Sequence, residues 1–124
     1  MLIAVCHCGD VKLTVPQSPR SLTACDCSIC RRYGALWAYY KAANVKVAAR
    51  GKALDKYMWG RKIRRFVRCS HCGTVMYYEY ASPRREKHIA VNARNFEPSI
   101  LGTIRIRSID GGPPRAKWYR HGAL

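Results

Sequence analysis

Seven cysteines in three short clusters constrain this 124-residue chain more than any other feature. The clusters are Cys6 with Cys8, then Cys25, Cys27 and Cys30, and finally Cys69 with Cys72. An odd number of cysteines at such close spacing favours thiolates bound to a soft metal over disulfides, which are the less favoured alternative. The thiols divide naturally as four plus three. This division predicts two zinc ions per chain, one in a closed structural site and one with a free coordination position.

Short β-strands are predicted between the cysteine clusters. Val11, Leu13 and Val15 alternate with polar residues, as in a strand with one buried face. Similar runs predict strands at 2–5, 10–15, 21–25, 35–41, 45–48, 54–59, 63–68, 74–80, 88–92 and near 104–109. Single turns of helix fit only 30–33 and 97–101, and 110–114 is a loop. We therefore expect a mainly β fold of short antiparallel strands stapled by zinc, in a single domain over residues 1–124.

The first and last cysteine pairs are candidates for the closed site. In an extended segment residues i and i+2 point the same way, so the first pair can present both sulfurs to one ion. The last pair lies in the knuckle Cys69-Ser70-His71-Cys72-Gly73, whose glycine permits the left-handed backbone that turns amides toward sulfur. Spacing alone would also allow Cys25 and Cys27 to join the last pair. We expect His7 and His71 to be surface residues carried by these turns.

The middle cluster is a candidate for the open site. Cys25, Cys27 and Cys30 would hold Zn²⁺ through three thiolates and leave a fourth position for water or a substrate thiol. Three thiolates weaken the ion as a Lewis acid, so the site suits binding and ionising a thiol better than generating hydroxide. The alternatives are that His88 or His121 closes this site as well, or that the three cysteines bind no metal.

The chain is strongly basic, with 23 Lys and Arg residues against 7 Asp and Glu and a formal net charge of +16. Such a surface attracts anions, from nucleic acid to a small acidic substrate, and charge alone does not choose among them. Arg31 and Arg32 follow the middle cysteine cluster directly, and Arg94 follows Asn92. These three arginines are the candidates for binding a carboxylate of an anionic ligand.

Other conspicuous side chains have simpler interpretations. The aromatic residues of the expected strands should mostly pack in the core or on a sheet face: Trp37, Tyr39, Tyr40, Trp59, Tyr77, Tyr78 and Tyr80. A second set should form a solvated, charged strand face: Lys62, Arg64, Arg65 and Arg68.

No apolar run approaches the roughly 20 residues of a membrane helix, and the first apolar stretch is too short for a secretory signal. We expect a cytoplasmic protein without a membrane partner, as a monomer or homodimer.

The ordered CxC, CxCxxC and CxxCG motifs resemble those of the glutathione-dependent formaldehyde-activating enzyme family, which includes the centromere protein V domain. The matching segments are 6–11, 25–32 with 34–35, 59–60, 65–66, 69–74, 91–94 with 96–98, and 110–111. They extend over nearly the whole chain. The resemblance implies the β-tent fold. It also implies structural zinc on Cys6, Cys8, Cys69 and Cys72 and catalytic zinc on Cys25, Cys27 and Cys30.

Two functional hypotheses follow. The leading one, implied by the resemblance, is a zinc-dependent carbon-sulfur lyase acting on a small acidic thiol such as glutathione and a small aldehyde, or on their adduct. Its zinc would take the substrate thiolate at the open position. The alternative is a non-catalytic zinc-binding module whose basic surface binds nucleic acid or another polyanion.

Overall fold

The computed structural model describes residues 1–82 and 87–109, and this part of the chain is mainly β. Its strands are β1 (Leu2–Val5), β2 (Val11–Val15), β3 (Ser21–Cys25), β4 (Trp37–Lys41), β5 (Lys46–Ala49), β6 (Leu54–Tyr57), β7 (Arg64–Cys69), β8 (Val75–Tyr80), β9 (His88–Asn92) and β10 (Arg105–Ile109). Its short helices are α1 (Cys30–Tyr33), η1 (Ala42–Asn44), η2 (Ala93–Asn95) and α2 (Pro98–Leu101). None of these helices is long and apolar enough to cross a membrane. The predicted loop at 110–114 lies outside the described residues.

The mainly β prediction is confirmed, and most element boundaries agree with the sequence pattern to within two residues. The expected ranges 21–25, 88–92 and 30–33 coincide with β3, β9 and α1. The largest differences are at turns. Strand β6 ends two residues early because 58–63 forms the turn to β7, in which the Lys62 amide donates to the Trp59 carbonyl. The 3-10 turns η1 and η2 were not predicted, since three residues carry no periodic signal.

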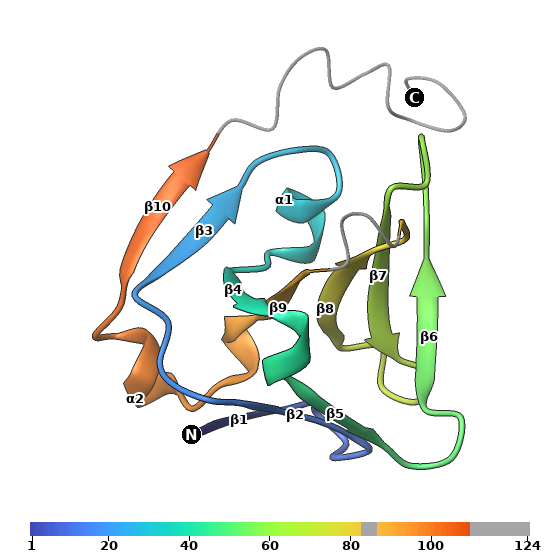
Figure 1. Cartoon of the computed structure of the whole chain (residues 1–124), viewed down its shortest axis with the longest axis horizontal. Helices are drawn as coiled ribbons and strands as arrows, with labels where there is room; N and C mark the ends of the chain where they lie inside the picture. Colours follow the sequence, from blue (N-terminus) through green and yellow to red (C-terminus); the bar gives the residue numbers. More distant parts are fainter. Residues whose placement is uncertain (83–86, 110–124) are drawn as a thin grey trace.

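The strands form two sheets. The smaller sheet has the order β1-β2-β5 and the larger one the order β10-β3-β4-β9-β8-β7-β6. In Figure 1 the two ends of the larger sheet stand apart, with α1 between them, and the smaller sheet lies below. The middle cysteine cluster therefore lies at the upper end of this arrangement, away from the smaller sheet.

The pairing of β10 with β3 is parallel, which corrects the expectation of an all-antiparallel fold. Residues Arg105 to Ile109 align with Ser21 to Cys25 in the same direction. A short hairpin forces antiparallel pairing only on strands that are neighbours in sequence, whereas these two are separated by most of the chain. The Asp26 amide then donates to the Ile109 carbonyl, so the end of β10 is bound to the start of the triple-cysteine loop.

Two hydrophobic clusters stabilise the fold. The larger one includes Leu13 and Val15 of the smaller sheet together with Val67 and Met76 of the larger sheet, and each of these side chains is fully buried. The smaller cluster is largely aromatic and packs beneath the middle cysteines. The molecule thus has one general core and a second, aromatic core that belongs to the candidate open site.

Replacing Leu13 by Ala tests the packing between the sheets. Leu13 has no exposed surface, so we expect the free energy of unfolding to fall by about 2–5 kcal/mol from lost burial and cavity formation. Its partner across the β2–β5 pair, Val47, is 39% exposed and serves as the control. Val47→Ala should change stability by less than about 1 kcal/mol. Urea unfolding followed by circular dichroism measures both; equal losses would contradict the packing described.

Candidate metal centres

Two turns from distant parts of the chain bring four thiols together. The sulfurs of Cys6, Cys8, Cys69 and Cys72 lie within 4.8 Å of one another. The first pair lies in the β1–β2 turn; of the second pair, Cys69 ends β7 and Cys72 lies in the β7–β8 turn. Cys8 Sγ is 3.7 Å from Cys6 Sγ and 3.7 Å from Cys69 Sγ, although Cys8 and Cys69 are 61 residues apart in the sequence. The group therefore connects the smaller sheet to the larger one.

Backbone amides point at these sulfurs. The amide of Val11 donates to Cys6 Sγ at 3.2 Å, and that of Cys72 points at Cys69 Sγ at 3.5 Å. Each turn also contains a glycine with a left-handed backbone, Gly9 at φ 89° and Gly73 at φ 79°. Such amide-lined turns favour thiolates, because an N–H dipole stabilises negative charge on sulfur.

The four thiols cannot all ionise by themselves. A hydrogen bond from the Thr74 hydroxyl lowers the pKa of Cys72 to about 5. The Asp10 backbone favours the thiolate of Cys8, but desolvation and the other thiols outweigh this effect and raise its pKa to about 12. A bound divalent cation removes this conflict, because its charge compensates several thiolates at once. Four sulfur donors at this spacing fit a tetrahedral zinc ion.

The histidines of the two turns lie outside this four-sulfur group. His71 Nδ1 is 3.0 Å from Asp10 Oδ2, a polar pair that bridges the two turns at the surface. Together with Cys8 Sγ these atoms form a group within 4.8 Å that shares Cys8 with the four-sulfur group. His7 is exposed, and its amide donates to the Thr74 hydroxyl at 3.3 Å.

The other three cysteines form a second group around the start of α1. The sulfurs of Cys25, Cys27 and Cys30 lie within 4.8 Å of one another. Cys25 ends β3, and the Cys30 amide at the first turn of α1 points at Cys27 Sγ at 3.4 Å. Among the described residues no histidine joins this group: His88 starts β9, opposite Lys41, and His121 lies outside the described part. The three sulfurs could hold a zinc ion and leave one position for another ligand.

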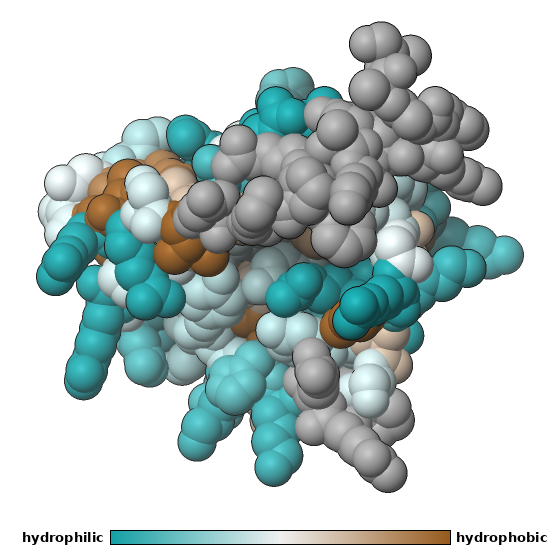
Figure 2. Space-filling model, turned by 90° about the horizontal axis from the view of Figure 1, so that it is seen from above, coloured by the Kyte–Doolittle hydropathy of each residue, from teal (hydrophilic) through white to brown (hydrophobic). Residues whose placement is uncertain are grey.

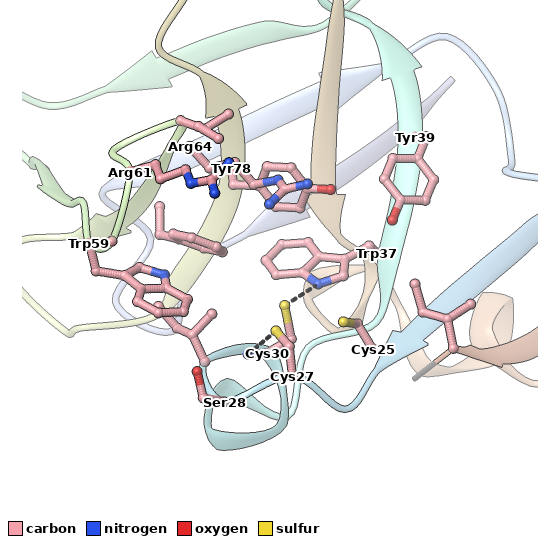
Figure 3. A pocket seen from close by; sticks show the side chains of 15 residues that line it. Cys25, Cys27, Ser28, Cys30, Trp37, Tyr39, Trp59, Arg61, Arg64 and Tyr78 are labelled. Carbon is pink, nitrogen blue, oxygen red and sulfur yellow. Dashed lines mark hydrogen bonds between the residues drawn. The ribbon is translucent and has the colours of Figure 1, made fainter. Parts of the chain in front are cut away.

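An aromatic cluster supports these sulfurs. The Trp37 Nε1–H donates to Cys30 Sγ at 3.4 Å (Figure 3). The Trp37 ring meets Tyr78 edge to face at 4.8 Å between centroids, and Tyr78 lies 5.4 Å from Phe66. Because Trp37 and Phe66 are buried, the indole N–H has a fixed direction. The donor therefore orients the sulfur and stabilises its thiolate form.

The three thiols differ in their tendency to ionise. Burial raises the pKa of Cys25, and burial also raises the pKa of Cys30 despite the Trp37 hydrogen bond. Burial opposes ionisation of Cys27 too, but amides of Cys30 and Ile29 and the neighbouring thiols outweigh it, so its pKa is lowered. Of the three thiols, Cys27 is therefore the one whose surroundings favour ionisation.

A cavity of about 540 Å³ opens at this group. The three cysteines line one end of it. Its other lining residues are Ser28, Ile29, Trp37, Tyr39, Trp59, Gly60, Arg61, Ile63, Arg64, Phe66, Tyr78 and Ile109. This volume lies within the range of small-molecule sites, roughly 300–1,000 Å³. The four-cysteine group does not contribute to this lining, so only one of the two thiol groups faces the cavity.

The arginines predicted to hold an anionic ligand do not line this cavity. Arg31 and Arg32 lie exposed on α1, and Arg32 Nη1 donates to the Ser28 carbonyl at 2.7 Å. Arg94 is exposed on η2 and donates through Nε to the Gly34 carbonyl. The contacts of Arg32 with Ser28 and of Arg94 with Gly34 hold the segments before and after α1 in place. The sequence pattern did not predict this structural role.

Sequence reasoning missed the cationic and polar side chains that do line the cavity. Arg64 was grouped with Arg65 and Arg68 in one charged face, and Tyr39 and Trp59 were assigned to packing. Tyr39 is 42% exposed at the cavity, whereas Trp37 and Tyr78 are buried as expected. Strand alternation is the signal that could have separated Arg64 from Arg65, because Arg64 shares a face of β7 with Phe66.

Replacing Trp37 by Phe tests the indole–sulfur hydrogen bond. The ring is largely kept while the Cys30 donor is lost, so we expect the three-cysteine group to bind Zn²⁺ about tenfold more weakly. The four-cysteine group should be unaffected. Competition with a chromophoric chelator measures both affinities. Trp59→Phe, which leaves the Cys30 contact intact, is the control; the same loss in both variants would contradict a specific role for Trp37.

The comparisons with known proteins agree with this geometry. The family model described as glutathione-dependent formaldehyde-activating enzyme matches residues 1–105. A crystal structure of a Rhodobacter sphaeroides protein matches with a TM-score of 0.70 at 25% sequence identity, covering 86% of this chain and 100% of the other. Among proteins with curated functions, none matches significantly. The extent of the family match shows that this chain belongs to the glutathione-dependent formaldehyde-activating enzyme family.

Proposed function

We propose that this chain is a zinc-dependent carbon-sulfur lyase that interconverts a thiol plus a small aldehyde and their S-hydroxyalkyl adduct. The observation that carries the proposal is the difference between the two thiol groups. The four sulfurs of one group lie together where the two sheets meet, whereas the three sulfurs of the other group face a cavity of about 540 Å³. Family membership supports glutathione as the thiol and formaldehyde as the aldehyde.

The two groups fit zinc in different ways. Cys6, Cys8, Cys69 and Cys72 would hold a structural ion, whose binding free energy contributes to folding. Cys25, Cys27 and Cys30 would hold the second ion. Zinc bound there supplies a position at which an incoming thiol can bind and lose its proton. Seven free cysteines are consistent with a reducing compartment, and we place the protein in the cytoplasm.

The residues around the open group prepare it for this chemistry. The Cys30 amide and the Trp37 indole direct N–H dipoles at Cys27 and Cys30. The aromatic cluster packs against these cysteines on their buried side. Holding the thiol and the aldehyde together in the cavity would contribute much of the rate, since addition needs little more than proximity once the thiol has ionised.

The reaction is balanced without a redox partner. The thiol R–SH loses its proton, and the sulfur forms a bond to the carbonyl carbon. The π electrons of the carbonyl move to its oxygen, which takes up a proton to give R–S–CH₂–OH when the aldehyde is formaldehyde. In the reverse direction the carbon–sulfur bond breaks and the carbonyl forms again.

Replacing Cys27 by Ser tests the proposal. We expect adduct formation catalysed by the zinc-loaded protein to fall to background while circular dichroism stays unchanged, because the variant loses one ligand of the second site only. Exchange spectroscopy by NMR on glutathione and formaldehyde measures the rate. Elemental analysis should give two zinc ions in the wild type and one in a Cys25/Cys27/Cys30 triple Ser variant.

The matched variant is Cys69→Ser, which removes a thiol from the other group. It should lose stability, whereas Cys27→Ser should not, because Cys69 is fully buried between two turns that join the sheets. A Cys27→Ser protein that is as active as the wild type would contradict the lyase proposal.

A second candidate function is binding of nucleic acid or another polyanion. It is favoured by the net charge of +16, and Figure 2 shows hydrophilic side chains projecting from several sides of the molecule. Binding of a DNA duplex should then weaken steeply with salt and persist in Cys27→Ser. Fluorescence anisotropy across a salt series measures it. If binding of the duplex disappears at physiological salt, the attraction is nonspecific, and this result would contradict the nucleic-acid function.

A further inference from the structure

Four arginines occupy the β6–β7 hairpin, and they fall into two classes. Arg65 Nε is 3.1 Å from Glu79, and Arg68 Nη2 is 2.7 Å from Asp55. Both pairs are directly opposite each other in neighbouring strands, so their charges are already compensated. Arg61 and Arg64 instead line the cavity, and none of the ion pairs among residues 1–82 and 87–109 includes either of them.

Arg64 is held in position by aromatic rings. Its guanidinium carbon lies 5.5 Å from the ring centroids of both Tyr78 and Tyr80. These cation–π contacts restrain the side chain, and the guanidinium keeps N–H groups with which it can donate to a ligand. The side chain is exposed, so a ligand can reach it. An arginine positioned in this way suits bidentate binding of a carboxylate.

The arginines and the sulfurs lie at opposite ends of the cavity. In Figure 3 the sulfurs of Cys25, Cys27 and Cys30 lie at one end, and Arg61 and Arg64 lie at the other. The rings of Trp37, Phe66 and Tyr78 form an apolar wall of the cavity between the sulfurs and the arginines. A cavity of about 540 Å³ exceeds what formaldehyde or a two-carbon thiol would fill. It suits a longer molecule with a thiol at one end and an anion at the other.

We propose that Arg64, assisted by Arg61, is the residue of this chain that binds a carboxylate of the thiol substrate and so selects charged over uncharged thiols. The inference rests on the proposed lyase function and names the specificity-determining residues of that same site. It assigns the anion to the β6–β7 hairpin in place of Arg31, Arg32 and Arg94, which do not line the cavity. Arg64 binds substrate and takes no part in the bond changes at sulfur and carbon.

The test compares glutathione with its diethyl ester, in which both carboxylates are converted to neutral ethyl esters. The protein is loaded with Co²⁺, and glutathione or its diethyl ester is titrated against the absorption bands of the metal. We expect glutathione to bind the wild type about tenfold more tightly than the ester, since charge-assisted hydrogen bonds to arginine are lost on esterification. Arg64→Gln should abolish most of this preference, and Arg64→Lys should keep the charge but lose the bidentate contact, giving an intermediate value.

The matched control is Arg20→Gln, which removes the same charge from an exposed loop before β3 and should keep the full preference for glutathione. In turnover Arg64→Gln should raise KM for glutathione with little change in kcat, because the contact is remote from the reacting atoms. Equal affinity of the wild type for glutathione and its ester would overturn the subsite and leave the lyase proposal standing. If neither thiol perturbed the cobalt spectrum, both proposals would be overturned.

Discussion

Convergence of four sulfurs from two turns that are distant in sequence is the constraint on which the rest of this structure depends. The β1–β2 turn and the β7–β8 turn belong to different sheets, yet Cys8 Sγ and Cys69 Sγ lie 3.7 Å apart. Four neighbouring thiols resist simultaneous ionisation, as the opposite pKa shifts of Cys8 and Cys72 indicate. A cation bound to these sulfurs would resolve this conflict and also join the sheets, so its binding would be coupled to folding.

The second thiol group has a different environment because it belongs to a different core. Its cysteines pack on the aromatic cluster of Trp37, Phe66 and Tyr78, whereas the larger core lies between the sheets. The amide and indole donors leave the sulfurs accessible from the cavity. Strand β10, paired in parallel with β3, holds the loop from the other side through the Ile109 carbonyl. Separate supports allow one site to stabilise the protein and the other to face a ligand.

The position of each arginine on its strand decides which groups its charge contacts. Arg65 and Arg68 pair with acidic residues of neighbouring strands, while the guanidinium of Arg64 lies over two tyrosine rings at the cavity. Neighbouring residues of one strand thus differ in role, since alternate side chains point to opposite faces. The high net charge by itself indicates only attraction to anions. The placement of single arginines indicates which anions a site can select.

The sequence by itself determined the mainly β class, most strand positions and the motif spacing of the thiols, because alternation and CxC or CxxC spacing are local properties. Local spacing left open whether Cys25 and Cys27 pair with Cys69 and Cys72; the family resemblance implied the division that the structure shows. Only the tertiary structure decided that β10 runs parallel to β3 and that Arg64 rather than Arg31 lines the cavity. These features join segments separated by tens of residues, and such contacts follow from the packing of whole sheets.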